Sequence, residues 1–421
     1  MQIGAEQVLR EGEIMLSYNS VDEALDELKR GRIIMVSDDE DRENEGDLIC
    51  AAQFATQENV NFMAVHAKGL ICMPMSSLHI SRLGLTPMTL NNTDNHETAF
   101  TVSVDHISTT TGISAKERSV TAIKCAEDNA KPSDFRRPGH MFPLEAKAGG
   151  VFERSGHTEA TVDLMRLAGL KEIGLCCEIM SDDGDMMKKE ELAAFAQKHN
   201  LKYITIKQIQ EYRRIYDIMI KREAKAKLPT SHGEFDIYGY QNIINGNHHV
   251  ALVMGDVKDK NVLCRIHSEC LTGDVFGSHR CDCGQQLHAA LDMINKEQCG
   301  ILIYMRQEGR GIGLINKLKA YELQENGYDT VDANIHLGFA PDLRDYAETA
   351  QILKDLGVKG IRLLTNNPHK IENIEDYGIK VTERVAIQVE ENKDDIKYLL
   401  TKKHRMGHLL TYDDNKERND V

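Results

Sequence analysis

The stretch Cys270–Gly284 reads CLTGDVFGSHRCDCG and places three cysteines within one short loop. Ten residues separate Cys270 from Cys281, and a single residue separates Cys281 from Cys283. Thiolates bind Zn²⁺ at about 2.3 Å, and a site with three protein ligands keeps a fourth position open for water or substrate. A structural zinc site normally has four protein ligands, so this loop favours a catalytic zinc site.

Two other interpretations of the loop stay open. A fourth ligand, such as His279, would turn the site into a structural one. Disulfide bonds are the second alternative, but Cys281 and Cys283 are too close to pair comfortably, and nothing marks the chain as secreted.

Polar motifs on both sides of the loop add to the zinc interpretation. They are RIHSE at 265–269, QQ at 285–286, RQEGRGIG at 306–313, DLRD at 342–345 and TNNPHK at 365–370. From about Arg265 to Arg384, and in one register, the sequence resembles GTP cyclohydrolase II, the zinc enzyme that opens guanine at the start of riboflavin synthesis. The resemblance implies GTP as the substrate, and a diaminopyrimidine nucleotide, formate and pyrophosphate as the products.

The same resemblance implies roles for individual residues. Cys270, Cys281 and Cys283 would hold a zinc ion that activates the water attacking guanine. Asp342 resembles the proton acceptor of the family, and Arg344 resembles the residue proposed to attack the α-phosphate. Because the pKa of a guanidinium exceeds about 12, charge stabilisation is the plainer role for Arg344. The residues implied to bind GTP are Arg265, Ile266, His267, Ser268, Glu269, Gln286, Glu308, Gly309, Arg310, Thr330, Thr365 and Lys370.

An acidic stretch, SDDEDRENEGD, occupies residues 37–47, directly after an apolar run at Ile33–Val36 that predicts a buried strand. The stretch is either a solvated turn or a site for a hard cation such as Mg²⁺, which prefers oxygen ligands. Farther on, the apolar run Leu175–Ile179 predicts a second buried strand that carries Glu178. A carboxylate is costly to bury unless it is paired or functional, so we expect a functional role for Glu178.

The acidic stretch belongs with four other motifs, which are TTTGISA at 109–115, RPGH at 137–140, RSGHTEA at 154–160 and CEIM at 177–180. Over about Ala24–Ile206 they resemble 3,4-dihydroxy-2-butanone 4-phosphate synthase. The resemblance implies conversion of ribulose 5-phosphate to that four-carbon phosphate and formate.

In this second resemblance Glu43 and His157 bind Mg²⁺ or Mn²⁺, which would stabilise an enediolate. His140 and Glu178 are the implied catalytic groups, and we assign Glu178 to proton transfer. Family members pair as dimers, so we expect a homodimer. The residues implied to bind the sugar phosphate are Arg42, Glu43, Asp47, Arg154, Ser155, Gly156, His157, Thr158 and Glu178.

The composition fits a globular protein with more than one domain. The chain has 421 residues, of which 41% are hydrophobic and 28% are charged. The net charge of −15 argues against nonspecific nucleic-acid binding. The sequence shows neither a secretory signal nor an apolar run of the ~20 residues that would span a bilayer, so we expect a cytoplasmic protein that does not bind membranes.

We expect an α+β (mixed α/β) fold with two domains, residues 1–214 and 215–421, each a mixed sheet with packed helices. The basic stretch Lys221–Ser231 is nearly free of large apolar residues and is the expected linker or domain edge. Other local patterns predict a capping box at Ser20 and Glu23, helices at 208–220 and 343–356, a loose lead-in at 1–19 and a charged tail at 392–421 that ends in disorder.

The two resemblances together predict a bifunctional enzyme that supplies both precursors of riboflavin. A protein with one inactive domain kept for dimerisation would have lost Glu43, His140 or His157, and all three are present. A zinc-knuckle module for nucleic acid would need basic surfaces and stacking aromatics. The negative net charge, 5% aromatic residues and absence of tryptophan speak against that module.

Overall fold

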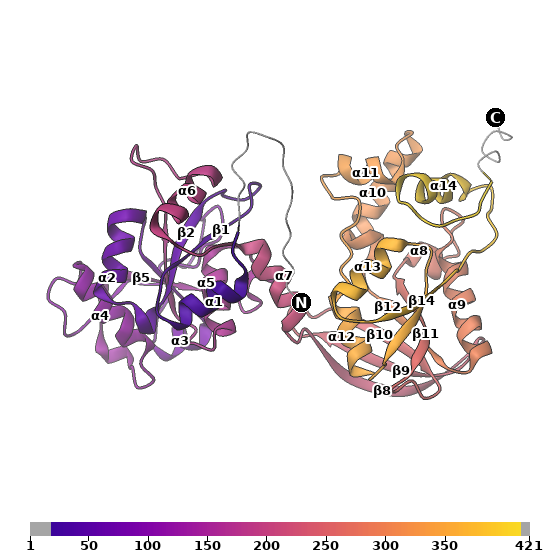
Figure 1. The fold of residues 1–421 in the computed structure, drawn as a ribbon, viewed down its shortest axis with the longest axis horizontal. Coiled ribbons are helices and arrows are strands. Elements are labelled where there is room, and N and C mark those ends of the chain that lie inside the picture. The colour runs from indigo at the N-terminus through magenta and orange to yellow at the C-terminus, as the bar shows by residue number, and fades with distance from the viewer. Residues whose placement is uncertain (1–17, 414–421) are drawn as a thin grey trace. The chain divides into compact units, whose positions relative to one another are not determined.

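The computed structural model describes residues 18–413 and divides into two compact units between Tyr216 and Asp217. Each unit contains one mixed sheet of seven strands with helices packed on it (Figure 1), which confirms the predicted fold class. The residues of the expected lead-in before Tyr18, and those of the expected disordered end after Asp413, lie outside this range. Within it, no helix is long and apolar enough to cross a membrane.

The first sheet has the strand order β4-β5-β3-β6-β2-β1-β7. Alternate residues of its central strands enter two separate cores, with Met35 on one face and Ile34 and Val36 on the other. The central strands are therefore buried on both faces, as their continuous apolar sequences require. The strands are β1 (Ile34–Ser37), β2 (Gly46–Ala51), β3 (Cys72–Met75), β4 (Val104–His106), β5 (Phe135–Glu145), β6 (Gly174–Glu178) and β7 (Tyr203–Thr205).

Helices cover this sheet and begin at the residues that can cap them. The predicted capping box is confirmed, because the Ser20 hydroxyl accepts a hydrogen bond from the Glu23 N–H and the Glu23 carboxylate accepts one from the Ser20 N–H. The helices are α1 (Val21–Lys29), α2 (Gln57–Phe62), α3 (Ser77–Arg82), α4 (Ala115–Ala126), α5 (His157–Leu167), α6 (Lys189–His199) and α7 (Ile206–Tyr216).

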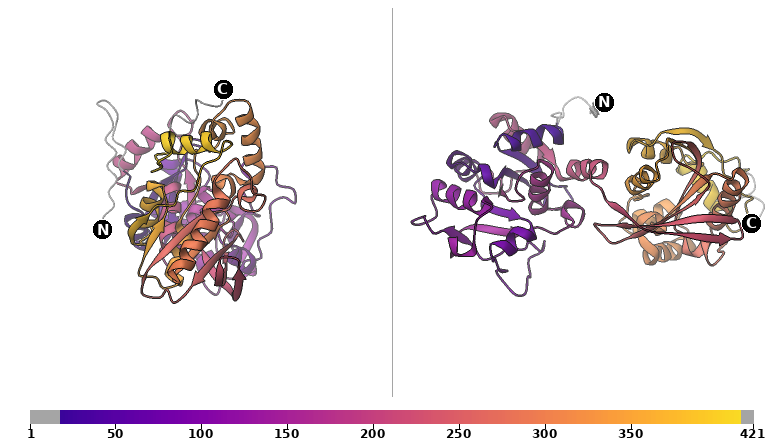
Figure 2. Two further views of the ribbon diagram at one scale, coloured as in Figure 1. Left: turned by 90° about the vertical axis from the view of Figure 1, so that its right-hand side faces the viewer. Right: turned by 90° about the horizontal axis from the view of Figure 1, so that it is seen from below.

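The second sheet has the order β14-β13-β11-β12-β10-β9-β8, and its long antiparallel strands β8 and β9 are visible in Figures 1 and 2. Strands β11, β12 and β13 are parallel, so their carboxyl ends meet at one edge. The cysteine loop and the motifs at 306–313 and 365–370 all begin at that edge. The strands are β8 (Ile220–Thr230), β9 (Gly233–Asn242), β10 (His248–Met254), β11 (Asn261–Ser268), β12 (Gly300–Met305), β13 (Gly360–Leu364) and β14 (Val381–Val385).

The helices of the second unit connect these strands and extend beyond the last of them. A short 3-10 turn, η5 (Glu308–Gly311), precedes α10. The helices are α8 (Leu271–Asp274), α9 (Cys283–Glu297), α10 (Gly313–Glu325), α11 (Thr330–His336), α12 (Ala347–Asp355), α13 (Pro368–Asp376) and α14 (Ile396–Arg405).

Several predictions of local structure are wrong. The stretch Lys221–Ser231, expected as a linker or domain edge, is not a linker but is almost entirely strand β8, which pairs along its length with β9. It does lie just after the boundary between the two units. It lacks large apolar residues because it is an edge strand whose side chains are mostly exposed. Helix α7 ends at Tyr216 instead of Ile220, and α12 begins at Ala347 instead of Leu343. The tail contains helix α14, which charge alone did not reveal.

A buried ion pair joins α5 to α7 in the first unit. Arg213 Nη1 lies 2.6 Å from Asp163 Oδ2, and the two side chains are 3% and 1% exposed. The Asp163 carboxylate also accepts a hydrogen bond from the Val151 N–H at 2.8 Å. The pair therefore fixes the last helix of the unit against the helix that begins at His157.

Replacing Arg213 with methionine removes the buried cation of Asp163, whose carboxylate is then paired only with the half-buried Arg166 at 2.8 Å. We therefore expect a loss in the free energy of unfolding of the first unit that is below the about 3–5 kcal/mol of a fully uncompensated buried charge. Hydrogen exchange of the α5 amides in the full chain, followed by mass spectrometry, measures this change. The matched control is Lys207→Met on the exposed side of α7, expected to stay within about 0.5 kcal/mol of the wild type. Unchanged exchange in α5 of the Arg213 variant would contradict the assigned role.

Candidate functional sites

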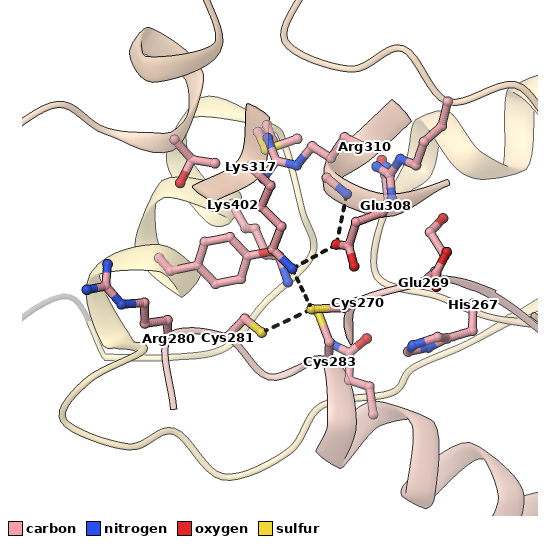
Figure 3. Close-up of a pocket in the computed structure, with 18 of the residues that line it drawn as sticks. His267, Glu269, Cys270, Arg280, Cys281, Cys283, Glu308, Arg310, Lys317 and Lys402 are labelled. Carbon is pink, nitrogen blue, oxygen red and sulfur yellow. Dashed lines mark hydrogen bonds and ion pairs between the residues drawn. The ribbon is translucent and has the colours of Figure 1, made fainter. Parts of the chain in front are cut away.

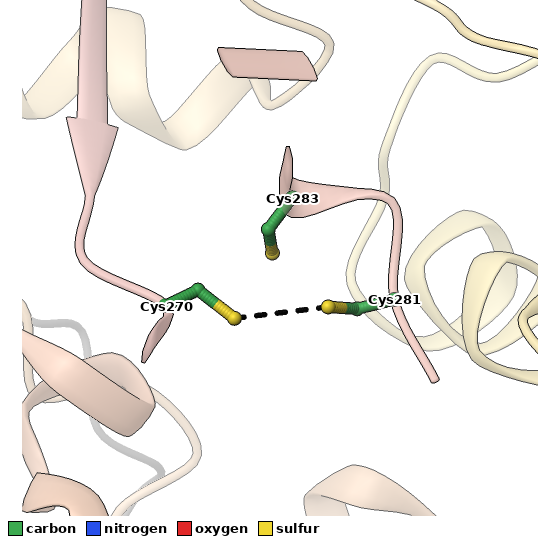
Figure 4. A group of neighbouring side chains, drawn as sticks. All are labelled: Cys270, Cys281 and Cys283. Atoms are coloured by element: carbon green, nitrogen blue, oxygen red, sulfur yellow. Dashed lines mark hydrogen bonds between the residues drawn. The ribbon is translucent and has the colours of Figure 1, made fainter. Parts of the chain in front are cut away.

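The three cysteine side chains of the second unit point toward one another (Figure 4). Their sulfur atoms all lie within 4.8 Å of one another, and Cys270 Sγ is 3.7 Å from Cys281 Sγ. Hydrogen bonds from the other two thiols, together with the Lys317 ammonium 3.2 Å away, lower the pKa of the Cys270 thiol below its ordinary value. Such a thiol loses its proton readily, as a metal ligand must.

The loop around the thiols fits a zinc ion. A Cβ atom added at Gly273 would lie 3.0 Å from Cys281 Sγ and 3.2 Å from Cys270 Sγ, so a side chain at this position would press on the thiols. Among the residues that the structure describes, no fourth histidine, cysteine or carboxylate belongs to the group. His279 is 72% exposed and faces Asp394 instead. Three sulfur ligands with an open fourth position are a donor set that suits catalytic zinc.

Two buried carboxylates shape this loop. Asp274 accepts hydrogen bonds from the Cys270 N–H at 2.9 Å, from His267 Nε2 at 3.0 Å and from the Tyr304 hydroxyl at 2.8 Å. Glu308 accepts one from the Leu271 N–H at 2.7 Å and ties the loop to η5. The loop geometry is therefore set by side chains from β11, β12 and η5 rather than by the loop alone.

A pocket surrounds the thiols, and residues from several loops line it (Figure 3). All the residues predicted to bind GTP lie on its wall except Ile266, which is fully buried behind it. Arg344 also lines the pocket, whereas Asp342 contacts Arg344 without lining it. The structure thus brings together residues that span more than 100 positions of the sequence.

The pocket holds an excess of positive charge. Within the described part of the chain, no ion pair with a carboxylate is formed by Arg265, Arg310 or Lys370, although two of these side chains are buried. Burial lowers the pKa of Lys370 well below its ordinary value, and nearby Arg265 and Arg344 lower it further. Arg265 Nε and Arg310 Nη1 are buried without a hydrogen-bond partner in the described part of the chain. These donors are suited to a polyanion such as a triphosphate.

Asp342 and Arg344 form a two-pronged ion pair at the edge of the pocket. Arg344 Nε lies 2.9 Å from Asp342 Oδ1, and Nη2 lies 2.5 Å from Oδ2. Although burial opposes it, charge interaction with Tyr346 and Asp342 raises the pKa of Arg344 above its usual value. The guanidinium therefore stays cationic, which makes it a poor nucleophile.

Among the polar residues of this pocket that sequence reasoning missed are Lys317, Tyr398, Lys402 and His408. Lys317 on α10 donates hydrogen bonds to Glu308 Oε1 at 2.8 Å and to Cys270 Sγ at 3.2 Å. Its spacing of four residues from Tyr321, which shares its helix face, is a signal that could have identified it. The other three, Tyr398, Lys402 and His408, come from the charged tail, where no motif marks them.

In the first unit the acidic loop after β1 meets the start of α5. Asp38, Glu43 and His157 each offer a ligand atom, and these atoms lie within 4.8 Å of one another. Asp38 was not among the predicted ligands. Its carboxylate accepts hydrogen bonds from the N–H groups of Glu43 and Glu45, and Arg42 Nη1 bridges Asp38 and Glu43 at 2.8 and 2.7 Å.

This group fits a hard divalent cation. His157 Nε2 and Asp47 Oδ1 are buried and have no hydrogen-bond partner within the described residues. Carboxylate oxygens with one imidazole nitrogen are donors that Mg²⁺ and Mn²⁺ accept. The ring nitrogen that faces the carboxylates is His157 Nδ1, which lies 3.9 Å from Glu43 Oε2 and 3.6 Å from Asp47 Oδ1. Together with the carboxylates of Asp38 and Glu43, His157 forms the donor set that a cation would occupy.

Asp47 and Glu178 are direct cross-strand partners on β2 and β6. Burial, with the neighbouring Glu178 and Glu43 charges, raises the pKa of Asp47 well above its ordinary value, and burial likewise raises the pKa of Glu178. Glu178 Oε2 accepts a hydrogen bond from the Leu70 N–H at 2.9 Å. A Cβ atom at Gly69 would lie 2.6 Å from that same oxygen, so glycine is required there.

Arg154 lies beside the N-terminus of α5, where Gly156 is the capping residue. Its Nη1 atom is 2.6 Å from Glu159 Oε2, and a Cβ atom at Gly156 would lie 2.2 Å from that nitrogen. Ser155 is exposed and Thr158 is buried in the first turn. The structure therefore joins the predicted phosphate-binding motif to the helix start that carries His157.

His140 stands apart from this cluster. Its Nδ1 atom is 2.8 Å from Asp105 Oδ2, and its N–H donates to Asp105 Oδ1 at 2.9 Å, which ties β5 to β4. Strand β3 separates β5 from β6, which carries Glu178. Asp105, on strand β4, was not predicted as a site residue.

Comparisons with known proteins match both halves of the chain. The family model of 3,4-dihydroxy-2-butanone 4-phosphate synthase matches residues 22–212, and that of GTP cyclohydrolase II matches residues 221–386. The riboflavin biosynthesis protein RibBA of Bacillus subtilis (strain 168) is 57% identical over 94% of this chain and 100% of its own length. RibBA of Bacillus cereus (strain ATCC 14579) is 53% identical over 93% of this chain and 99% of its own.

A solved structure is similar to both units. RibBX, described as a two-domain 3,4-dihydroxy-2-butanone 4-phosphate synthase from A. baumannii, matches with a TM-score of 0.61 and 34% identity. The match covers 82% of this chain and 94% of that one.

The Asp47–Glu178 pair predicts how stability depends on pH in protein treated with a chelator. A carboxyl whose pKa is raised by folding binds its proton more tightly in the folded state, so its unfavourable contribution grows as the pH rises from the unfolded pKa through the folded one. We expect Asp47→Asn to raise the thermal unfolding temperature, and to raise it more at pH 8 than at pH 5. Each unit of pKa shift removed contributes about 1.4 kcal/mol.

The matched control is Asp39→Asn, which changes the net charge equally at an exposed position of the same loop. Differential scanning calorimetry of the metal-free protein at both pH values provides the measurement. An equal gain at pH 5 and pH 8 would count against a raised pKa at Asp47.

Proposed function

The chain belongs to the bifunctional riboflavin biosynthesis family that joins 3,4-dihydroxy-2-butanone 4-phosphate synthase to GTP cyclohydrolase II, and we propose that it acts on both ribulose 5-phosphate and GTP. Residues 1–214 would perform the first reaction, as a lyase, and residues 215–421 the second, as a zinc hydrolase. The observation that carries the proposal is that each unit holds its own metal-donor set, with oxygen and imidazole donors in one and thiols in the other.

In the first unit, Asp38, Glu43 and His157 would hold Mg²⁺ or Mn²⁺. When bound, the cation supplies charge stabilisation for an enediolate of the sugar phosphate. Arg154 and the N–H groups at the start of α5 are placed to bind the phosphate. Glu178 exchanges a proton with the substrate, because its raised pKa brings a carboxyl closer to the working pH.

His140 is the second catalytic group that we propose for this reaction. Its Nδ1–H donates to Asp105, which fixes the ring and leaves Nε2 free to accept a proton. Because β3 separates His140 from Glu178 in the sheet, the arrangement is consistent with a site that uses both subunits of a homodimer. Light scattering tests that assembly, and a monomeric mass would count against it.

In the second unit, Cys270, Cys281 and Cys283 would hold Zn²⁺, which when bound supplies a water of lowered pKa. The cations Arg265, Arg310 and Lys370 would bind the phosphates of GTP. Their lack of carboxylate partners among residues 18–413 supports this role, because a triphosphate would supply the missing counter-charge. The products would be the diaminopyrimidine nucleotide, formate and pyrophosphate.

We assign Arg344 to charge stabilisation at the phosphates and Asp342 to proton acceptance. The ion pair with Arg344 lowers the pKa of Asp342 despite its burial, which weakens Asp342 as a base while the pair is intact. Contact of Arg344 with a phosphate would release the carboxylate. Binding of the nucleotide and activation of the base are therefore coupled through one ion pair.

Formate release from GTP and from ribulose 5-phosphate, measured in separate tubes with Mg²⁺, tests the two activities. We expect release from both. Cys281→Ser should abolish only the GTP reaction, and Glu43→Ala only the sugar reaction. Because each change removes a metal ligand itself, the loss of activity should exceed the about 10–100-fold loss seen when a residue that hydrogen-bonds to a metal ligand is replaced. Each variant is the folding control for the other. Release from a single substrate would leave the other unit without its proposed activity.

The role of Arg344 is tested by Arg344→Lys. If the residue stabilises charge, the lysine variant keeps part of the GTP activity, and KM rises because the two-pronged geometry is lost. We expect the intact mass of the wild type, quenched during turnover, to show no nucleotide attached to the protein. A trapped nucleotide adduct that disappears in the variant would instead establish a nucleophile.

A further inference from the structure

Helix α14 and the segment after it form one wall of the thiol pocket. The GTP cyclohydrolase II family model ends at residue 386, before this helix begins at Ile396. Even so, Tyr398, Lys402, Met406 and His408 line the pocket together with the cysteines. The tail is therefore part of the site although no motif within it indicates this.

Two polar attachments hold the tail over the pocket. Arg405 forms ion pairs with Asp329 and Asp332, and Asp329 immediately precedes the predicted GTP-binding residue Thr330. Beyond the helix, the Leu409 N–H donates a hydrogen bond to the Asn366 carbonyl at 2.8 Å, in the loop that follows β13. Both attachments thus end beside residues that line the pocket.

The third attachment reaches the cysteine loop itself. Lys402 Nζ lies 2.7 Å from Asp282 Oδ1, and the two side chains are only 12% and 1% exposed. Asp282 stands between Cys281 and Cys283 in the sequence. The ring of Tyr398 lies beneath the ammonium, with its centroid 4.3 Å from Nζ, and limits where the lysine can point.

Asp282 in turn connects Lys402 to residues predicted to bind GTP. Its Oδ2 atom accepts a hydrogen bond from Gln286 Nε2 at 2.5 Å. Gln286 Oε1 in turn accepts one from Arg265 Nη2 at 2.5 Å, and Arg265 Nη1 donates to the Leu364 carbonyl at 2.8 Å. A continuous chain of charge-assisted hydrogen bonds therefore runs from the tail to the floor of the pocket.

The ammonium also balances a charge that would otherwise oppose the ligand. Asp282 is a buried carboxylate beside a pocket whose other charged donors suit a polyanion. Without Lys402 it would remain buried and uncompensated, and would repel a nucleotide phosphate. His408 Nε2 is buried in the same wall without a hydrogen-bond partner among the described residues, which leaves a further polar atom available to a ligand.

We propose that the tail segment 396–408 is a structural part of the nucleotide site and that Lys402 is its positioning residue, acting through Asp282 on Gln286 and Arg265. The inference rests on the proposed function of the second unit as an enzyme that binds GTP. Lys402 is not a catalytic residue in this scheme, because its ammonium contacts Asp282 rather than the reacting atoms.

The test uses the full chain with Lys402→Met and Lys402→Arg, and Lys403→Met as the matched control. Lys403 is the next residue of the same helix, but its Nζ donates to the Tyr412 carbonyl and it does not line the pocket. We expect Lys402→Met to raise KM for GTP, and Kd for a non-hydrolysable GTP analogue, at least about tenfold, with a smaller change in kcat. Lys402→Arg should recover most of the loss, and Lys403→Met should resemble the wild type.

Zinc content and the rate of the ribulose 5-phosphate reaction distinguish a positioning role of Lys402 from a loss of folded structure in the variants. Both should equal the wild type in every variant, and loss of zinc in Lys402→Met would overturn the proposal in favour of a merely structural role. The double variant Asp282→Asn/Lys402→Met removes both charges and should bind the analogue more tightly than Lys402→Met alone. An unchanged KM and Kd in Lys402→Met would also overturn the proposal.

The analogue distinguishes this inference from the function on which it rests. Analogue binding that weakens in Lys402→Met, in a protein that releases no formate from GTP, would support the inference and contradict the proposed reaction. If the protein turns over GTP but the rate does not depend on Lys402, the proposed reaction would be supported and the inference contradicted.

Discussion

Burial of like charges close together is the constraint on which both units depend. In the first unit Asp47 and Glu178 are cross-strand partners on two neighbouring strands. In the second unit Arg265 and Lys370 lie buried without a carboxylate partner among the residues that the structure describes. An isolated buried charge opposes folding strongly. Each sheet must therefore supply enough apolar packing to hold these groups in place before any ligand arrives. The first sheet does so with a core on each of its faces.

The two clusters have opposite signs, and this separates the chemistry of the two units. The first unit has an excess of carboxylate groups and so suits a bound cation. The second has an excess of guanidinium and ammonium groups and so suits a bound polyanion. The net charge of −15 describes neither site, because it sums over surfaces that the ligands do not touch. Local charge at the carboxyl ends of β11, β12 and β13 determines what the second pocket can bind.

Sequence reasoning located the elements that carry these sites but not all of their partners. The cysteine loop was identified from the spacing of its three cysteines, and the motifs at 306–313 and 365–370 from their resemblance to GTP cyclohydrolase II. Asp38 was missed because one carboxylate in an acidic run resembles any other until the loop turns it toward His157. Lys402 was missed because its role depends on its contact with Asp282, which is 120 positions earlier in the chain. Contacts of that range leave no periodicity in a single sequence.

Strand β8 was interpreted as a linker or domain edge because its composition is charged, and that composition has a physical purpose. As the last strand of its sheet, it presents unpaired backbone N–H and C=O groups along one side. Such an edge is a template on which strands of other chains can add, leading to aggregates. The exposed lysine, arginine and glutamate side chains of residues 221–227, followed by Pro229, oppose that addition. The charged residues that made this strand hard to recognise in the sequence thus also oppose the pairing of its edge with another copy of the protein at high concentration.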